Sequence, residues 1–141
     1  MDDDKRRLCW HGMFLFLLGL LTGLAEPHFQ NPRMGLAAHL EGILNGIFLL
    51  ALASIWSGLK LSATQRTVAY WSTLSGTYIN WATTTLAAIL GTAALSPITA
   101  AGHSAPAWQE ILVTLGFVSV GLTIIAASAI VLWGLRKTAA T

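Results

Sequence analysis

Polar side chains that could do chemistry enter an otherwise apolar stretch in the first third of the sequence. Between residues 35 and 46 the chain reads GLAAHLEGILNG, which contains His39, Glu41 and Asn45. On a helix of about 3.6 residues per turn, His39 shares one stripe with three glycines, namely Gly35, Gly42 and Gly46. A neutral imidazole binds haem iron, and glycines leave room for a flat macrocycle beside the helix. A haem would therefore suit this stripe.

The glycines also have a second explanation. Small residues let two membrane helices pack closely, and Gly42-x-x-x-Gly46 is an instance of the GxxxG pattern. That explanation leaves His39, Glu41 and Asn45 unexplained, because polar groups at membrane depth are costly and are usually paired or functional.

A second group of polar residues lies further along the chain, between residues 73 and 84. One helical face collects most of them: Thr73, Thr77, Asn80 and Thr84. A buried amide such as that of Asn80 must find a partner, which could be another helix or a bound substrate. Tyr78 offers a phenol that could donate to a developing oxyanion or could pack at an interface.

The composition shows which elements must position these groups. The chain has 141 residues, of which 55% are hydrophobic and only 10% charged, and its mean hydropathy is +0.65. Soluble domains carry about a quarter charged residues, and a domain this small could not bury so much apolar surface. A freely soluble globular domain is therefore excluded. The one cysteine, Cys9, excludes an internal disulfide and a cysteine-based metal cluster.

Four apolar stretches are long enough to cross a bilayer as helices, at about residues 8–25, 35–59, 68–95 and 107–135. Pro27, Pro32, Pro97 and Pro106 lie in the predicted connections, where helices can end. We predict an all-α membrane protein, a four-transmembrane-helix bundle that forms a single domain over residues 1–141.

The basic residues predict how the bundle is oriented. Seven of the eight Lys and Arg residues fall in the N-terminal tail, the second connection and the C-terminus, and Arg33 alone falls on the other side. Basic residues favour the cytoplasmic side, so both termini are expected to be cytoplasmic in the inner membrane. We expect a belt of tryptophans at the two interfaces, with Trp108 at the outer one and four others at the inner one: Trp10, Trp56, Trp71 and Trp133.

The residues alone leave several functions open. A haem-carrying electron-transfer subunit would pair His39 with a second ligand such as His28 or His103. A small four-helix transporter would use Glu41 as a proton or cation site. A structural membrane module would use every polar residue to hold helices together.

Four sequence runs carry a family resemblance that favours an enzyme. They are WHG at residues 10–12, NPRMGL at 31–36, AHLEGILNG at 38–46 and GTYINW at 76–81. These runs resemble the hydroxylaminobenzene mutase family, and the similarity extends from about residue 8 to residue 136. The chain is also distantly similar to styrene oxide isomerase, a four-helix membrane enzyme.

The resemblance implies a cofactor, an assembly and a reaction. In the isomerase family the residue matching His39 is the axial ligand of haem b, and the residue matching Asn45 holds the substrate oxygen. The assembly is a homotrimer with haem at the subunit interfaces. The tyrosine and aspartate on the third helix of that family correspond here to Thr84 and Gly76, so the substrate is expected to differ from an epoxide.

The mutase resemblance implies conversion of arylhydroxylamines to 2-aminophenols by intramolecular hydroxyl transfer, with haem iron as Lewis acid. We expect Asn45 and Asn80, with Tyr78, to orient the substrate and Glu41 to move a proton. His39, flanked by the glycine stripe, is the expected iron ligand. The expected partners are a small aromatic hydroxylamine, the bilayer and further copies of the chain.

Overall fold

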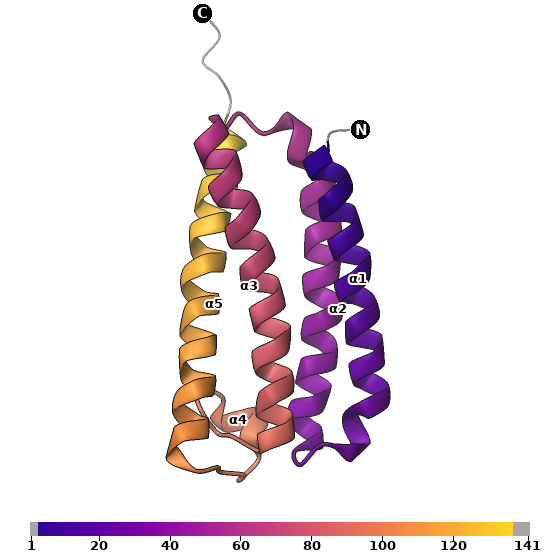
Figure 1. Ribbon diagram of the computed structural model, residues 1–141, viewed down its shortest axis with the longest axis vertical. Coiled ribbons are helices and arrows are strands. Elements are labelled where there is room, and N and C mark those ends of the chain that lie inside the picture. Colours follow the sequence, from indigo (N-terminus) through magenta and orange to yellow (C-terminus); the bar gives the residue numbers. More distant parts are fainter. Residues whose placement is uncertain (1–2, 137–141) are drawn as a thin grey trace, which may run out of the picture.

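The computed structural model describes residues 3–136, and they form a bundle of long helices (Figure 1). The four long helices are α1 (Asp3–Ala25), α2 (Pro32–Ile55), α3 (Ala63–Leu90) and α5 (Ala107–Gly134). Three short helices occupy the connections: η1 (Glu26–His28), η2 (Trp56–Gly58) and α4 (Pro97–Ala100). The described residues contain no strand, so the all-helical prediction is confirmed.

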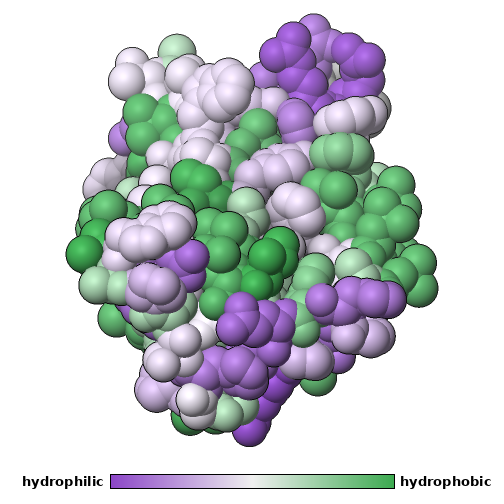
Figure 2. All heavy atoms as spheres, turned by 60° about the horizontal axis from the view of Figure 1, so that its bottom comes forward, coloured by the Kyte–Doolittle hydropathy of each residue, from purple (hydrophilic) through white to green (hydrophobic). Residues whose placement is uncertain are grey.

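Neighbouring long helices pack in chain order, so that α2 lies between α1 and α3 and α5 packs on α3 (Figure 1). The start of α1, the α2–α3 connection and the end of α5 lie at one end of the bundle, and η1 and α4 lie at the other. Figure 2 brings the η1 and α4 end forward and shows hydrophilic groups there beside the hydrophobic flanks. Such flanks are typical of a protein that sits in a bilayer.

The prediction of four membrane spans is confirmed in part. Within residues 3–136, three segments are long and apolar enough to cross a membrane: Asp3–His28, Pro32–Gly58 and Ala107–Gly134. The helix α3 matches α5 in length, at 28 residues, but it is not among the three. Threonines, serines and Asn80 lower the mean hydropathy of α3. The polar face that suggests a function for α3 therefore also makes it harder to identify as a membrane span.

Local capping moves two helix starts away from the predicted boundaries. The helix α3 begins at Ala63, because the Ser62 hydroxyl accepts the Gln65 N–H and the Gln65 side chain accepts the Ser62 N–H. This reciprocal capping box starts the helix five residues before the apolar stretch does. The helix α2 starts at Pro32, which stands at a first-turn position where its missing N–H costs nothing.

Glycines bring α1 and α2 into contact. A Cβ on Gly19 would lie 2.6 Å from the Ile43 backbone nitrogen and 2.8 Å from the Gly42 carbonyl carbon. Near the other end of the pair, a Cβ on Gly46 would lie 2.7 Å from the Gly12 carbonyl oxygen. These distances leave no space for a side chain, so the two helices touch backbone to backbone.

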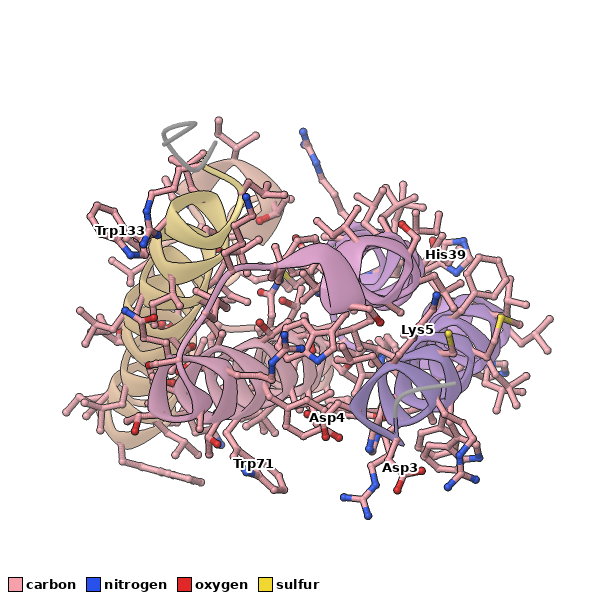
Figure 3. The ribbon with its side chains drawn as sticks, turned by 90° about the horizontal axis from the view of Figure 1, so that it is seen from above. Asp3, Asp4, Lys5, His39, Trp71 and Trp133 are labelled. Atoms are coloured by element: carbon pink, nitrogen blue, oxygen red, sulfur yellow. The ribbon has the colours of Figure 1, made fainter. Side chains whose placement is uncertain are left out.

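One tryptophan departs from the predicted interface belt. Trp56 is fully buried, with its ring 6.1 Å from that of Tyr70 and with the Arg66 guanidinium 5.4 Å from its centroid. Arg66 also donates to the carbonyls of Trp56, in η2, and of Leu59, which follows η2. Trp56 lies at the expected end of the bundle but packs inward, because hydropathy cannot tell a tryptophan at a helix end that packs inward from one that faces lipid. The other four are exposed, namely Trp10, Trp71, Trp108 and Trp133, and Figure 3 shows Trp71 and Trp133 pointing outward.

Glu110, in the first turn of α5, contacts two parts of the α3–α5 connection. Its carboxylate accepts N–H groups from Ala93, Ala94 and Ala105 at 2.8–3.1 Å. These bonds pin both ends of the connection to the first turn of α5. Glu110 therefore holds the backbone of the α3–α5 connection in place.

Asn31 connects the start of α2 to α4. Its Oδ1 accepts the Met34 N–H at 3.1 Å, and its Nδ2 donates to the carbonyls of Thr99 and Ala100 at 2.9 and 3.0 Å. Asn31 is 1% exposed, so its amide is buried and these bonds satisfy its own donor and acceptor.

We expect Asn31→Ala to destabilise the protein by about 2–3 kcal/mol, because it removes the cap of α2 and both hydrogen bonds that tie this side chain to α4. Asn31→Ser keeps a capping acceptor and loses the amide that donates to α4, so its loss should be smaller. Thermal unfolding in detergent measures both. Equal losses for the two variants would contradict the capping role.

Candidate active site

His39 lies on α2 and faces α1. Its Nδ1–H donates to the carbonyl oxygen of Gly19 at 2.8 Å, and since a carbonyl only accepts, Nε2 keeps the free lone pair. Metal-binding histidines usually donate their second nitrogen in this way, which fixes the tautomer and the ring orientation. Figure 3 places His39 at the outer edge of the α1–α2 pair, away from α3 and α5.

Gly23 makes the space in which the imidazole ring of His39 lies. A Cβ at this position would lie 2.5 Å from Nδ1 and 2.9 Å from Cε1 of the ring. The ring is partly exposed, and large apolar side chains such as Leu36 and Leu40 are exposed on the same helix. Sequence reasoning overlooked Gly19 and Gly23, although their four-residue spacing in the first helix is itself a GxxxG pattern.

The glycines predicted to cradle a haem pack against this chain itself. Gly42 and Gly46 meet the backbone of α1, and a Cβ on Gly35 would lie 2.8 Å from the Phe29 ring. These contacts support close helix packing, which is the second of the two explanations of the glycine stripe. Any proposal for a haem on this face depends on His39 and not on these glycines.

Glu41, Asn45 and Asn80 form one hydrogen-bonded cluster between α2 and α3. The Nδ2 of Asn45 donates to Oε2 of Glu41 at 3.2 Å, and the Nδ2 of Asn80 donates to the same oxygen. All three side chains are partly buried. The structure therefore brings together three of the four residues predicted to be catalytic.

Tyr78 does not join this cluster. Its hydroxyl lies 3.0 Å from Nδ1 of His11 on α1, and the two rings meet edge to face with centroids 5.7 Å apart. Positions two apart on a helix point about 200° from each other, so Tyr78 and Asn80 cannot share a face of α3. This pair borders an apolar surface pocket of about 330 Å³, lined by His11, Trp71, Leu74, Ser75, Tyr78 and Ile79.

The remaining polar residues of α3 are largely satisfied within the bundle. Thr77 and Thr84 donate to backbone carbonyls one turn earlier, at 2.9 Å each, as threonines in membrane helices commonly do. Gly76 packs against α5, since a Cβ there would lie 2.6 Å from the end of the Ile124 side chain. Thr84 and Gly76 therefore act as packing residues in this chain.

The imidazole of His39 and the carboxylate–amide cluster lie on different sides of α2. His39 faces α1, whereas Glu41, two residues later, faces α3. Residues 3–136 contain no group of three or more His, Cys, Asp or Glu side chains that could hold a metal ion. A lone imidazole with a free Nε2 is suited to a metal that brings its own equatorial ligands, as iron does in a porphyrin.

Fold and site together define a helical membrane protein with a carboxylate–amide cluster inside its bundle. A family model described as styrene oxide isomerase matches residues 4–136. The chain is 46% identical over 136 residues to hydroxylaminobenzene mutase HabB of Ectopseudomonas oleovorans, covering 96% of this chain and 83% of the relative. It is 41% identical over 127 residues to hydroxylaminobenzene mutase HabA of the same organism, covering 89% of this chain and 94% of the relative. No solved structure matches the chain.

The chain belongs to the styrene oxide isomerase family. Its curated relatives are mutases, so it is an enzyme of the isomerase class, and the resemblance seen in the four sequence runs is confirmed.

Proposed function

We propose that this chain converts arylhydroxylamines of the hydroxylaminobenzene type to 2-aminophenols by moving the hydroxyl group from nitrogen to the ortho ring carbon. The observation that carries the proposal is the identity with two hydroxylaminobenzene mutases, which extends over 96% and 89% of this chain. The aligned lengths cover nearly the whole bundle and so include the helices that build the carboxylate–amide cluster.

The proposed reaction defines what the side chains must do. The N–O bond breaks, a C–O bond forms at the ortho carbon, and the proton of that carbon replaces the lost substituent on nitrogen. The product is an isomer of the substrate, so no oxidant is consumed. Asn45 and Asn80 orient the oxygen and the nitrogen through hydrogen bonds, and Oε1 of Glu41 carries the proton from carbon to nitrogen.

The apolar bundle contributes by excluding water. The ring is electron-poor while the oxygen moves, and water would attack it and yield a different product. A small aromatic substrate dissolves in lipid. In this proposal the protein lies in the cytoplasmic membrane with both termini on the inner side, so the bilayer supplies the substrate directly to the site.

We include haem b in the proposal, held by Nε2 of His39. The fit rests on the Nδ1–H bond to the Gly19 carbonyl, on the space left by Gly23, and on the apolar, partly exposed surroundings of the ring. When bound, the haem would supply a Lewis-acidic iron for the hydroxyl oxygen.

A homotrimer completes the proposed site. Because His39 and Glu41 face opposite sides of α2, the imidazole of one protomer meets a carboxylate–amide cluster only in a neighbouring protomer. The helix α5 leaves room for such neighbours, since only Val113, Ala127 and Gly134 are buried along its 28 residues.

Oxygen labelling tests the proposed reaction. Hydroxylaminobenzene carrying ¹⁸O should give 2-aminophenol that retains the label, and unlabelled substrate in ¹⁸O-water should give unlabelled product. Acid-treated substrate without enzyme is the control, because there the oxygen of the aminophenol comes from water. Extensive exchange in the enzymatic reaction would contradict intramolecular transfer, and failure to form 2-aminophenol would overturn the function.

A further inference from the structure

We propose that the pocket between α1 and α3 beside His11 and Tyr78 is a second binding site, which takes single-ring aromatic compounds that carry a hydroxyl or hydroxylamino group. Glu41, Asn45 and Asn80 do not line this pocket, so the site is separate from the carboxylate–amide cluster. The arylhydroxylamine and the 2-aminophenol of the proposed reaction both belong to this class of compound. Their identification as the natural ligands rests on the proposed function.

The pocket is built from one face of α3 and one residue of α1. His11 faces α3 from α1, and four of the other lining residues recur at helical spacing. Those four are Trp71, Leu74, Ser75 and Tyr78. An apolar cavity of about 150 Å³ is large enough for benzene, so a pocket of about 330 Å³ can hold one aromatic ring with a small polar substituent.

Aromatic rings make up half of the lining. Three of the six lining residues carry one, namely His11, Trp71 and Tyr78. Trp71 is exposed and points outward from α3 (Figure 3). Aromatic rings attract one another beyond the effect of the apolar area that they bury. The lining therefore favours an aromatic ligand over an alkyl chain.

The hydrogen-bonded pair leaves one donor and at least one acceptor for a ligand. A neutral imidazole carries one N–H and a phenol carries one O–H, so the pair has two polar hydrogens. The bond between Nδ1 of His11 and the Tyr78 hydroxyl uses one of them. If the hydroxyl donates, Nε2–H remains as a donor and the hydroxyl oxygen as an acceptor. If Nδ1–H donates, the hydroxyl hydrogen remains as the donor and Nε2 as an acceptor.

Within residues 3–136 nothing uses the remaining donor. Nε2 of His11 has no hydrogen-bond partner there, and it is not among the buried polar atoms that lack one, so it is open to a ligand. An unpaired donor is costly on the apolar flank of a membrane protein. A hydroxyl or hydroxylamino group both donates and accepts, and would therefore satisfy the pair whichever way its own bond runs.

Holding α1 against α3 does not by itself explain the pair. Trp81 and Thr22 join the same two helices, and they use every polar hydrogen of their side chains. The indole N–H of Trp81 donates to the Thr22 hydroxyl at 2.9 Å, and that hydroxyl donates to the Leu18 carbonyl at 2.8 Å. The pair of His11 and Tyr78 joins the helices and leaves a hydrogen over, next to a pocket.

The experiment compares the binding of phenol and toluene to the detergent-purified protein. The two probes have the same ring and the same number of heavy atoms, but only phenol can donate and accept a hydrogen bond. Equilibrium dialysis against protein-free micelles corrects for uptake by the detergent. We expect the wild type to bind phenol about tenfold more tightly than toluene.

Two double variants locate this preference. His11→Phe combined with Tyr78→Phe removes both polar groups and keeps the rings, so phenol should bind about tenfold more weakly and no better than toluene. His28→Phe combined with Tyr70→Phe makes the same two changes outside the pocket and should keep the wild-type preference. An unshifted preference in the first double variant would overturn the proposal. Equal binding of the two probes by the wild type, as expected of a groove for alkyl chains, would overturn it as well.

Two additions keep the test decisive. Ser75→Phe places a ring in the pocket and leaves the pair of His11 and Tyr78 intact, so it should weaken both probes at least tenfold even if the first double variant does not fold. A wild type that binds neither probe would overturn the site, and a loss of oligomeric mass in Ser75→Phe would then assign this flank to a second copy of the chain. Turnover of hydroxylaminobenzene is assayed in parallel. Phenol binding without turnover in the wild type overturns the proposed function alone, whereas turnover without phenol binding overturns the second site alone.

Discussion

Replacing His39 with alanine is expected to abolish haem binding and to reduce mutase activity by more than about 100-fold. Even groups that only support a metal ligand are worth about 10–100-fold, and His39 is proposed as the protein's sole ligand to the iron. The proposed role draws on the Nδ1–H bond to the Gly19 carbonyl, which leaves the lone pair of Nε2 for a metal. Absorption spectra of detergent-purified protein measure the Soret band, and haem extraction gives the stoichiometry.

His11→Ala is the matched control for this experiment. His11 is the other histidine in a long helix, but its ring bonds to Tyr78 on a different face of the bundle, so its loss should leave the Soret band intact. Adding imidazole to the His39→Ala protein should restore part of the band by filling the space that the ring leaves. A colourless wild type with full activity would remove iron from the mechanism, and an unchanged band in His39→Ala would assign the iron to another ligand.

The second large effect is expected at the contact between α1 and α2. Gly19→Leu should destabilise the protein by about 3 kcal/mol or more, because the first added carbon already meets backbone atoms of Ile43 and Gly42 that cannot move aside. The melting temperature in detergent measures the loss. Haem content should fall as well, since the Gly19 carbonyl that orients His39 would move with α1.

Gly121→Leu makes the same substitution in the middle of α5, where an added Cβ would have no heavy atom within 4 Å. This variant should keep the melting temperature close to that of the wild type. If both leucine variants lose the same stability, close packing of α1 on α2 is not the cause. If Gly19→Leu has the melting temperature of the wild type, α1 and α2 are not held backbone to backbone.

Several features of the fold were predictable from local sequence properties. The apolar stretches gave helices in all four expected places, because a backbone in lipid can satisfy its hydrogen bonds only within such elements. The reciprocal bonds of Ser62 and Gln65 were also local, but they extended α3 into a segment that hydropathy assigned to a turn. Where hydropathy was ambiguous, capping hydrogen bonds therefore set the helix boundary.

The candidate site was predictable only in its residue types. Glu41, Asn45 and Asn80 drew notice because amides and carboxylates are costly in an apolar helix, and the structure joins all three. In the sequence Tyr78 is as plausible a catalytic residue as these three, but in the structure it faces His11. Helical periodicity gives the angle between two residues of one helix, but it does not give which neighbouring helix lies at that angle.

Composition and periodicity were thus sufficient for the membrane class, the helices and the chemistry that could occur, since all of these depend on residues close together in the chain. The partners of each helix face depended on contacts between segments distant in the chain. The backbone of α1 fills the glycine stripe beside His39, α3 brings Asn80 to Glu41, and Trp56 turns inward beneath Arg66. Such contacts arise from close packing of whole helices, and no local pattern encodes them.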